Sequence, residues 1–203
     1  MGDWGNLQLL YKTMSPKLQN KLYKKFPTLF SRRKLDEMES CMYFGIECDD
    51  GWYDLIYRMC EKLQEYGDEN GLKFQLEQVK QKFGALRVSL YNEFSSANIL
   101  RTSNTGYRTL LREQYNFAQK IINKYEEHSA TVCEETGGEG QLCKLYKSST
   151  MNYRTLSTMS ATLLGFTPVK KWPDKNTKYT SKTSLADPTV AKCPKEEHAR
   201  DQT

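Results

Sequence analysis

The sequence predicts an α+β fold in which an antiparallel β-hairpin, or small sheet, packs on amphipathic helices. Residues 49–66 and 106–127 carry apolar side chains at helical spacing, which is typical of helices with one buried face. Between them, residues 72–90 alternate apolar and polar side chains with a period of two, which is typical of half-buried strands. A hairpin between two amphipathic helices indicates the α+β class.

Composition bounds the size of the core and the kind of partner. The chain has 203 residues, of which 38% are hydrophobic and 27% charged, with a mean hydropathy of -0.74 and a net charge of +5. These values predict one α+β domain with a modest core, residues 1–167, followed by a Lys/Pro-rich extended tail, residues 168–203. The positive charge permits an anionic partner without requiring one.

Targeting signals and cysteine usage both indicate the cytoplasm. No run of about 18 apolar residues is present, so we expect no transmembrane helix and no membrane partner. The stretch Met1–Trp4 lacks the order of a signal peptide. The six cysteines are too few and too widely spread for a disulfide framework, so we expect a cytoplasmic protein in which most thiols are free.

The first predicted element is a basic helical segment, residues 12–34, with eight cationic and no acidic residues. Ser15-Pro16 favours a helix start, and Pro27 ends the helix. This surface fits phosphate or an acidic protein, although a solvated helix face explains the same charges and is the more common case. The candidate binding residues here are Lys21, Lys24, Lys25, Arg32 and Arg33.

A helix over residues 49–66 follows a short strand or core-facing loop at 42–46. We expect Asp49 or Asp50 to cap it, because a short carboxylate accepts the free N–H groups of the first turn. Its buried face is predicted to hold Trp52, Leu55, Ile56, Met59, Cys60 and Leu63. The stretch Gly67–Gly71 is predicted to break the chain as a turn.

The hairpin over residues 72–90 is predicted to have its turn or bulge at Lys82–Ala85. The apolar parity changes near Gln78, which indicates a bulge or twist there. The long helix over 106–127 comes next. Its buried stripe is predicted to be Tyr107, Leu110, Leu111, Ala118, Ile121, Ile122 and Tyr125.

The C-terminal part begins with the glycine-rich segment Cys133–Cys143, which is predicted to form a tight knuckle and a short strand. Tyr153–Ser157 is predicted to open a last short helix, for which Gly165 is a suitable C-cap. Leu156, Met159, Leu163 and Leu164 are spaced for burial on that helix. In the tail, the candidate residues for docking on a partner are Lys170, Lys171 and Trp172.

Three pieces of the chain resemble an uncharacterised family of phage and prophage proteins. Cys48–Leu55 resembles the family's C-G-D-G-W-Y-x-L helix start, and Gln78–Arg87 resembles its Q-V-K-E-K-F-G-x-L-R hairpin. Ser129–Cys143 together with Tyr153–Leu156 is similar to its C-terminal zinc-ribbon-like motif, C-E-x-C-G followed by Y-x-T-L-C. The resemblance spans about residues 40–165 and implies a viral origin. It implies no activity, because the family has none assigned.

The resemblance also implies a ribbon-like part, residues 129–167, that has lost its metal. Thr136 stands where the family has its second cysteine, and Ser157 stands where it has another. Zinc needs about four ligands in a closed site, which two remaining cysteines cannot supply. We expect a degenerate zinc ribbon that packing holds together, with no cofactor. The alternative is a site rebuilt from His128, Cys133 and Cys143.

The sequence contains few of the residue patterns that are typical of catalytic sites. It has no Ser-His-Asp order, no nucleotide-binding glycine loop and no pair of metal ligands on a helix. Asp49 and Asp50 form a carboxylate pair of the kind used in acid/base chemistry, but a helix cap explains them more cheaply. The chain is therefore predicted not to be an enzyme.

Three functions remain, in order of preference. The first is a phage-encoded binding protein that inhibits or redirects a host macromolecule, such as a host-defence protein or a host enzyme. The second is nucleic-acid binding through the basic N-terminal segment and the tail. The third is a sponge for a nucleotide signal, for which the candidate residues are Lys80, Arg87, Arg108 and Arg112.

Overall fold

The computed structural model describes residues 13–91, 105–146 and 152–169. The longer elements are α1 (Pro16–Lys25), α2 (Tyr53–Asn70), β2 (Leu76–Lys82), β3 (Ala85–Leu90), α4 (Thr105–Ser129), β4 (Gln141–Leu145), β5 (Asn152–Leu156) and α5 (Thr158–Leu164). The shorter ones are η2 (Ser31–Lys34), η3 (Cys41–Phe44), β1 (Ile46–Glu47), η4 (Asp50–Trp52) and β6 (Thr167–Pro168). This arrangement confirms the predicted α+β class.

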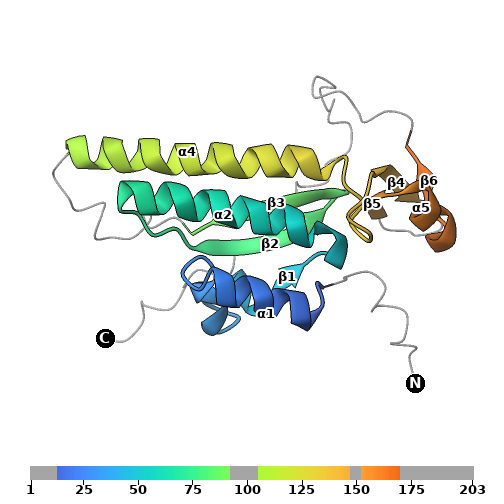
Figure 1. The fold of residues 1–203 in the computed structure, drawn as a ribbon, viewed down its shortest axis with the longest axis horizontal. Coiled ribbons are helices and arrows are strands. Elements are labelled where there is room, and N and C mark those ends of the chain that lie inside the picture. Colours follow the sequence, from blue (N-terminus) through green and yellow to red (C-terminus); the bar gives the residue numbers. More distant parts are fainter. Residues whose placement is uncertain (1–12, 92–104, 147–151, 170–203) are drawn as a thin grey trace, which may run out of the picture.

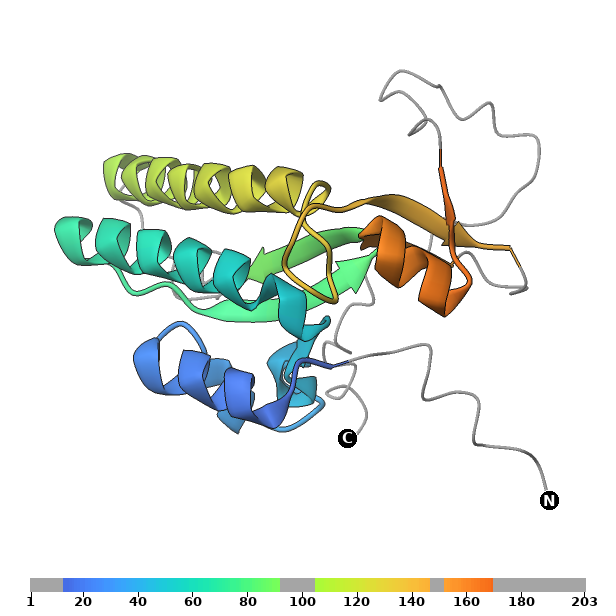
Figure 2. The same cartoon turned by 45° about the vertical axis from the view of Figure 1, so that its right-hand side comes forward.

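The larger sheet has the strand order β1-β2-β3 and lies between helical layers (Figure 1). Strand β2 runs antiparallel to β3 and parallel to β1. Helices α2 and α4 lie side by side, with α4 along β3, and α1 lies beyond β2 in both ribbon views (Figures 1 and 2). The segments η2 and η3 pack against β2.

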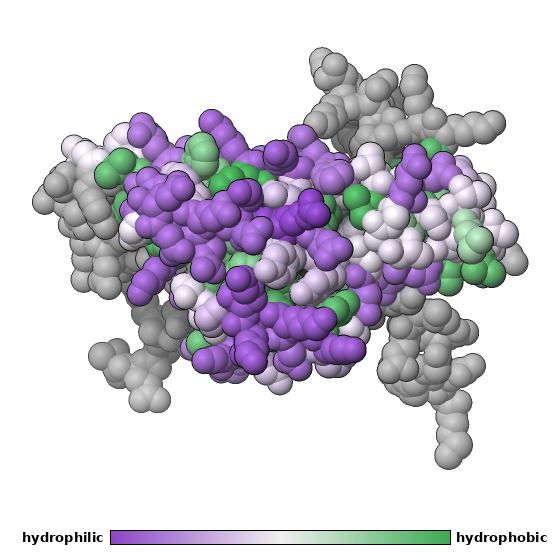
Figure 3. Space-filling view, in the orientation of Figure 1, coloured by the Kyte–Doolittle hydropathy of each residue, from purple (hydrophilic) through white to green (hydrophobic). Residues whose placement is uncertain are grey.

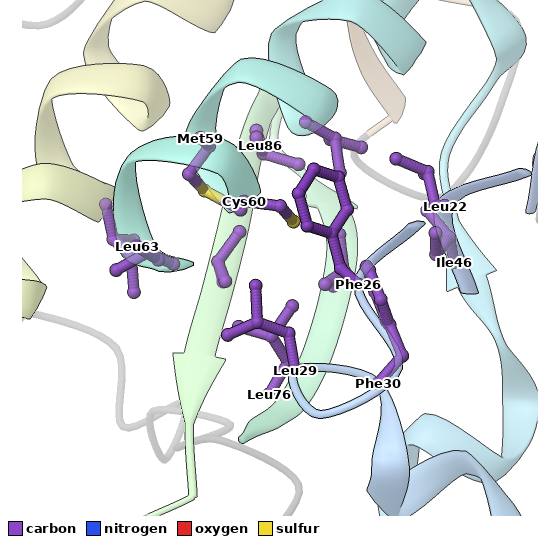
Figure 4. Close-up of a cluster of buried hydrophobic side chains, with 14 of the residues drawn as sticks. Leu22, Phe26, Leu29, Phe30, Ile46, Met59, Cys60, Leu63, Leu76 and Leu86 are labelled. Carbon is purple, nitrogen blue, oxygen red and sulfur yellow. The ribbon is translucent and has the colours of Figure 1, made fainter. Parts of the chain in front are cut away.

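A single hydrophobic core joins these layers (Figure 4). Phe26 and Phe30 come from the N-terminal segment and face Cys60 of α2 and Leu76 of β2 in the same cluster. All six positions of the apolar stripe predicted for the second helix are buried. The helical period therefore identified the inward face of α2 correctly.

A second, smaller sheet has the order β5-β4-β6 and carries α5 at one end of the molecule (Figure 1). Its own buried cluster contains Cys133, Cys143, Leu156 and Ala161. Strand β6 spans the predicted boundary between the domain and the tail, because it pairs both Thr167 and Pro168 with β4. Beyond it, the Val169 N–H donates a hydrogen bond to the Leu142 carbonyl at 2.9 Å. The folded C-terminal part thus continues at least to Val169.

Helix α4 covers the outer edge of strand β3 with two of its side chains. The Val88 N–H donates to Glu126 Oε1 at 2.7 Å, and the Leu86 N–H donates to Ser129 Oγ at 2.9 Å. An edge strand otherwise presents unpaired N–H groups that can recruit another strand. These two side chains therefore close the sheet edge within the chain.

The hairpin has both of the irregular features that its sequence predicts, a bulge near Gln78 and a turn at Lys82–Ala85. The register shifts between Leu76 and Gln78, which confirms the predicted bulge. The turn lies at Lys82–Ala85, and its central residues Phe83 and Gly84 have φ angles of 54° and 79°. Two positive φ values are the feature of type I′ turns, whose twist matches that of the flanking strands.

Helix α1 begins at Pro16 as expected, but the side-chain N-caps predicted for the first two helices do not form. Neither Ser15 nor Asp49 makes a side-chain capping hydrogen bond. Instead, the Ser15 N–H donates to Asp50 Oδ1 at 2.6 Å, so that Asp50 ties the start of α1 to η4. The chain passes through η4 before α2 begins at Tyr53.

The predicted turn at Gly67–Gly71 is wrong in extent. Helix α2 continues through Gly67 to Asn70, and Gly71 ends it with a φ of 66°. Gly67 packs closely under the Leu72 carbonyl, since a Cβ there would lie 2.8 Å from that oxygen. A close approach of the backbone, rather than a turn, accounts for this glycine.

The C-terminal element boundaries also differ from the prediction. Residues Asn152–Leu156 form strand β5, and the helix begins only after Ser157, whose Oγ accepts from the Ser160 N–H at 3.1 Å. Gly165 is confirmed as the left-handed C-cap. Contrary to expectation, Leu110 of α4 and both Met159 and Leu163 of α5 are exposed. Among the described residues they therefore add apolar surface rather than core.

Candidate functional site

Two of the three resemblance motifs interlock at the junction between the large sheet and the C-terminal sheet. The Gly51 N–H donates to the Glu134 carbonyl at 2.8 Å. A Cβ at Gly51 would lie 2.5 Å from that oxygen and 2.6 Å from the Cys133 carbonyl. Glycine is therefore required at position 51, because the backbone of the knuckle presses directly against it.

Two further contacts fasten the same junction. The indole Nε1 of Trp52 donates to the Val132 carbonyl at 2.8 Å. At the hairpin tip, the Thr155 hydroxyl donates to the Gly84 carbonyl at 2.5 Å, and the Leu142 side chain fills the space beside Gly84. All three motifs thus meet through backbone contacts that their glycine and tryptophan residues make.

A charged cluster lies within this junction. Arg154 of β5 donates to Asp49 through Nη2 and to Glu134 through Nε, the latter at 3.0 Å. The three side chains are 12%, 12% and 3% exposed, respectively. Glu134 also accepts a hydrogen bond from the Asp49 N–H at 3.3 Å. One guanidinium therefore links two carboxylates that lie 85 positions apart in the sequence.

Burial controls the electrostatics of this cluster. Burial raises the pKa of the Glu134 carboxyl, and the nearby Arg154 charge opposes that shift without cancelling it. Burial lowers the affinity of Arg154 for its proton, but the two carboxylates outweigh this effect and raise its pKa. Asp49 and Glu134 are thus engaged with an internal cation, and their geometry suits a structural role better than acid/base catalysis.

The environment of Cys133 is built from hydroxyls and backbone N–H groups. Burial favours the neutral thiol, but hydrogen bonds from the Thr136 side chain and from the N–H groups of Ser157, Thr136 and Glu135 outweigh it and lower the Cys133 pKa. Ser160 Oγ lies 3.9 Å from the Cys133 sulfur and 3.1 Å from Ser157 Oγ. Thr136 and Ser157, which stand where the family motif has cysteines, therefore both lie beside Cys133, as does Ser160.

The alternative metal site does not assemble. Cys133 and Cys143 are buried in one cluster, whereas His128 is exposed in the last turn of α4. In the described ranges, no group of three or more His, Cys, Asp or Glu side chains is placed to hold a metal ion. Zinc ligation by the residues at hand would need at least one further ligand brought to the two thiols.

The predicted binding cations of the N-terminal segment fall into two groups. Lys21, Lys24 and Lys25 are exposed on α1. Arg32 is engaged internally: its Nε lies 2.5 Å from Glu77 Oε2, and its guanidinium lies 3.8 Å from the centroid of the Tyr91 ring. Arg33 is exposed and lies 4.6 Å from the centroid of the Tyr23 ring. The lysines of the helix thus face solvent, while Arg32 holds η2 onto β2.

The remaining candidates are spread over the molecule. Lys80 and Arg87 are cross-strand partners in the hairpin, and Arg87 Nη1 lies 3.3 Å from Glu126 Oε2 of α4. Arg112 is exposed on α4, and Arg108 belongs to the same helix, with its side chain outside the described part. The tail candidates Lys170, Lys171 and Trp172 lie outside the described residues.

Sequence reasoning missed the partners of the junction. Glu134 and Arg154 lie inside the quoted motifs, but neither shows a spacing that reveals a contact with Asp49. The sequence gives only a weak signal for this buried ion pair. Its carboxylate simply follows a cysteine, and its arginine stands among residues that favour β-strands.

No protein-family model, curated protein or solved structure matches this chain. No helix in the described part of the chain has the length and apolar character needed to cross a bilayer.

Proposed function

We propose that this chain is a phage-encoded, non-enzymatic binding protein that inhibits or redirects a host macromolecule in the host cytoplasm, with a host protein as the partner. The observation that carries the proposal is how its charges are divided. The carboxylates and arginine of the motifs neutralise one another inside the junction, whereas the lysines of α1 face outward. This division of charge supports contact with another surface over acid/base chemistry at the junction.

The solvent face of α1 supports an acidic partner. Lys17, Lys21, Lys24 and Lys25 recur at intervals of three and four along the helix, which places them on one side. Helix α1 contains no acidic residue, and Leu22 is buried on the opposite side. Hydrophilic residues dominate this part of the surface (Figure 3). Such a single-sign stripe steers association with an oppositely charged surface and favours fast encounter.

Affinity capture from bacterial lysate tests the proposal. The tagged full chain is compared with a variant that carries Lys17→Glu, Lys21→Glu and Lys24→Glu, and with the control Lys120→Glu/Lys124→Glu on exposed positions of α4. Lysates are treated with nuclease before mass spectrometry. We expect one stoichiometric host protein with the wild type and the control, and its loss with the α1 variant. Retention by the α1 variant would contradict a role for this face.

Nucleic-acid binding through the same lysines is the second candidate, because phosphates are also anionic. It predicts an affinity that falls steeply with salt, with a slope close to the number of phosphates neutralised. Capture that disappears on nuclease treatment would replace the first proposal with this one. The nucleotide-sponge prediction has weaker support, because Arg87, one of its candidate cations, already contacts Glu126.

A further inference from the structure

A second surface, distinct from α1, combines aromatic rings with lysines where the hairpin tip meets the C-terminal sheet. We call it the aromatic–lysine face: Lys82, Phe83, Lys144, Tyr146 and Tyr153. Lys82 Nζ lies 5.5 Å from the centroid of the Phe83 ring. Lys144 Nζ lies 4.9 Å from the centroid of Tyr146 and 5.5 Å from that of Tyr153. Each of the two lysines therefore lies near at least one aromatic ring.

The pairing of β4 with β5 places these residues on one side of the sheet. Leu142 and Thr155 are cross-strand partners, and both contact Gly84 at the hairpin tip. Because side chains alternate along a strand, residues two positions from each of them share that side. Lys144 and Tyr153, themselves cross-strand partners, therefore face the same way as the hairpin tip.

The tip and the sheet are held together at this point. Gln81 Nε2 donates a hydrogen bond to the Tyr153 carbonyl, next to the contacts of Gly84. The buried cluster of Cys143, Leu156 and Ala161 belongs to the opposite side of the sheet, where α5 packs. On the side that meets the hairpin tip, Lys82, Lys144 and Tyr153 are half-buried, whereas Phe83 and Tyr146 are 46% and 65% exposed. The aromatic–lysine face therefore offers two accessible rings.

Phe83 occupies a position that a bulky residue rarely takes. Its φ of 54° is the only positive value at a non-glycine residue of the described chain. Hairpin turns of this kind favour Asn, Asp or Gly at that position, so a phenylalanine there carries backbone strain. A ring that is 46% exposed recovers only part of its burial free energy within the chain, so a strained conformation that keeps it there points to a contact outside the chain.

We propose that the aromatic–lysine face binds single-stranded nucleic acid. Flat exposed rings stack unpaired bases, and the adjacent ammonium groups neutralise phosphates. The strands QLCKL and NYRTL, like the hairpin residues Gln78–Ala85, contain no acidic side chain, so the face is complementary to a polyanion. A duplex offers its phosphates but hides its bases, and therefore satisfies the lysines alone. The proposal is independent of the lysine face of α1.

Fluorescence anisotropy with a labelled oligo(dT) strand tests this proposal on the full chain. The test variants are Phe83→Asn and Tyr146→Ser. Asn accommodates a positive φ, so Phe83→Asn removes the ring without weakening the turn, and thermal unfolding should show an equal or higher Tm. The matched controls are Tyr43→Ser and Phe44→Ser, which remove two exposed rings from η3.

We expect each test variant to bind the strand roughly five- to a hundredfold more weakly, the usual effect of losing one stacked base. Both controls should bind as the wild type does, and unlabelled duplex should compete less well than unlabelled single strand. Unchanged affinity in Phe83→Asn and Tyr146→Ser would overturn the proposal. So would competition by duplex or by poly-glutamate as effective as that by the single strand, since either would mean that the face recognises charge alone.

Discussion

Gly51 shows how one residue fixes the junction between the two sheets. Any side chain at this position meets two carbonyl oxygens of the knuckle and the Gly137 N–H group, all of them backbone atoms. Backbone atoms cannot rotate out of the way as a flexible side chain can. The requirement for glycine thus comes from a tertiary contact, because its φ is not in the left-handed region.

Replacement of Gly51 by alanine is therefore expected to lower the free energy of unfolding by about 3 kcal/mol, the upper end of the usual cost of overpacking. Urea unfolding followed by circular dichroism measures the change. Gly138→Ala in the same knuckle is the control, because the nearest atom to its added Cβ is Thr136 Oγ1 at an ordinary 3.6 Å. Equal stability of the two variants would show that the junction yields more easily than its geometry indicates.

The fate of Asp49 shows where residue-level prediction from sequence fails. A short acidic residue before a helix is a good cap, and local pattern alone gives no reason to reject that role. Its carboxylate instead binds Arg154, which lies 105 positions later. The fold buries Arg154 beside Asp49, and a buried charge left without its partner is costly. A distant partner therefore took precedence over a correct local preference.

At the scale of elements, strong periodicity predicted well and weak periodicity did not. Helix α2 and the β2–β3 hairpin have long regular patterns, and their inward faces and turn are as expected. Strand β5 is only five residues long, and one side of it faces the hairpin tip while the other faces a small cluster. Such a strand has no clean alternation, so Tyr153–Ser157 gave the appearance of a helix start.

The exposure of α5 has the same origin. Met159 and Leu163 lie one turn apart and are both exposed, while Ala161 contributes the buried side. A seven-residue helix beside a three-stranded sheet can bury only one narrow stripe, which its small residues occupy. Apolar spacing alone cannot distinguish that stripe from an exposed pair. Figure 3 shows apolar surface at this end of the molecule.

The edge contact between α4 and β3 yields a pH prediction. Burial raises the pKa of Glu126 above its ordinary 4.5, although the Val88 N–H and Arg87 oppose this shift. At pH values between 4.5 and the raised pKa of Glu126, the folded state binds more protons than the unfolded state. The contribution of Glu126 to stability therefore falls as the pH rises through that interval and is constant outside it.

Glu126→Gln keeps an acceptor for the Val88 N–H but does not titrate. We expect the stability of the wild type relative to Glu126→Gln to fall as the pH rises through the interval, as measured by urea unfolding at a series of pH values. Ser129→Ala is the control: it removes the other edge contact, so it lowers stability by a constant amount. If the stability of the wild type relative to Glu126→Gln instead rose with pH through this interval, the raised pKa of Glu126 would be refuted.

At the scale of the whole molecule, two hydrophobic clusters of unequal size share one junction. The larger cluster includes most of the buried side chains, and the smaller one at the C-terminal sheet is too small to be stable by itself. The smaller part therefore depends on the contacts of Gly51, Trp52, Gly84 and Arg154 for its order. This dependence explains why all three resemblance motifs meet at one place.

Arg154→Met tests that dependence. The substitution leaves Asp49 and Glu134 buried side by side without a counter-charge, which typically costs about 3–5 kcal/mol. Because the smaller cluster depends on the junction for its order, we expect this loss to appear there first. Hydrogen exchange followed by mass spectrometry should show faster exchange in β4, β5 and α5, with exchange in α2 and β2 nearly unchanged. The double variant Arg154→Met/Glu134→Gln should recover part of the protection, because it removes one of the two unpaired charges. Uniformly faster exchange throughout the described chain would instead mean that both clusters unfold as one cooperative unit, with the junction as part of a single core.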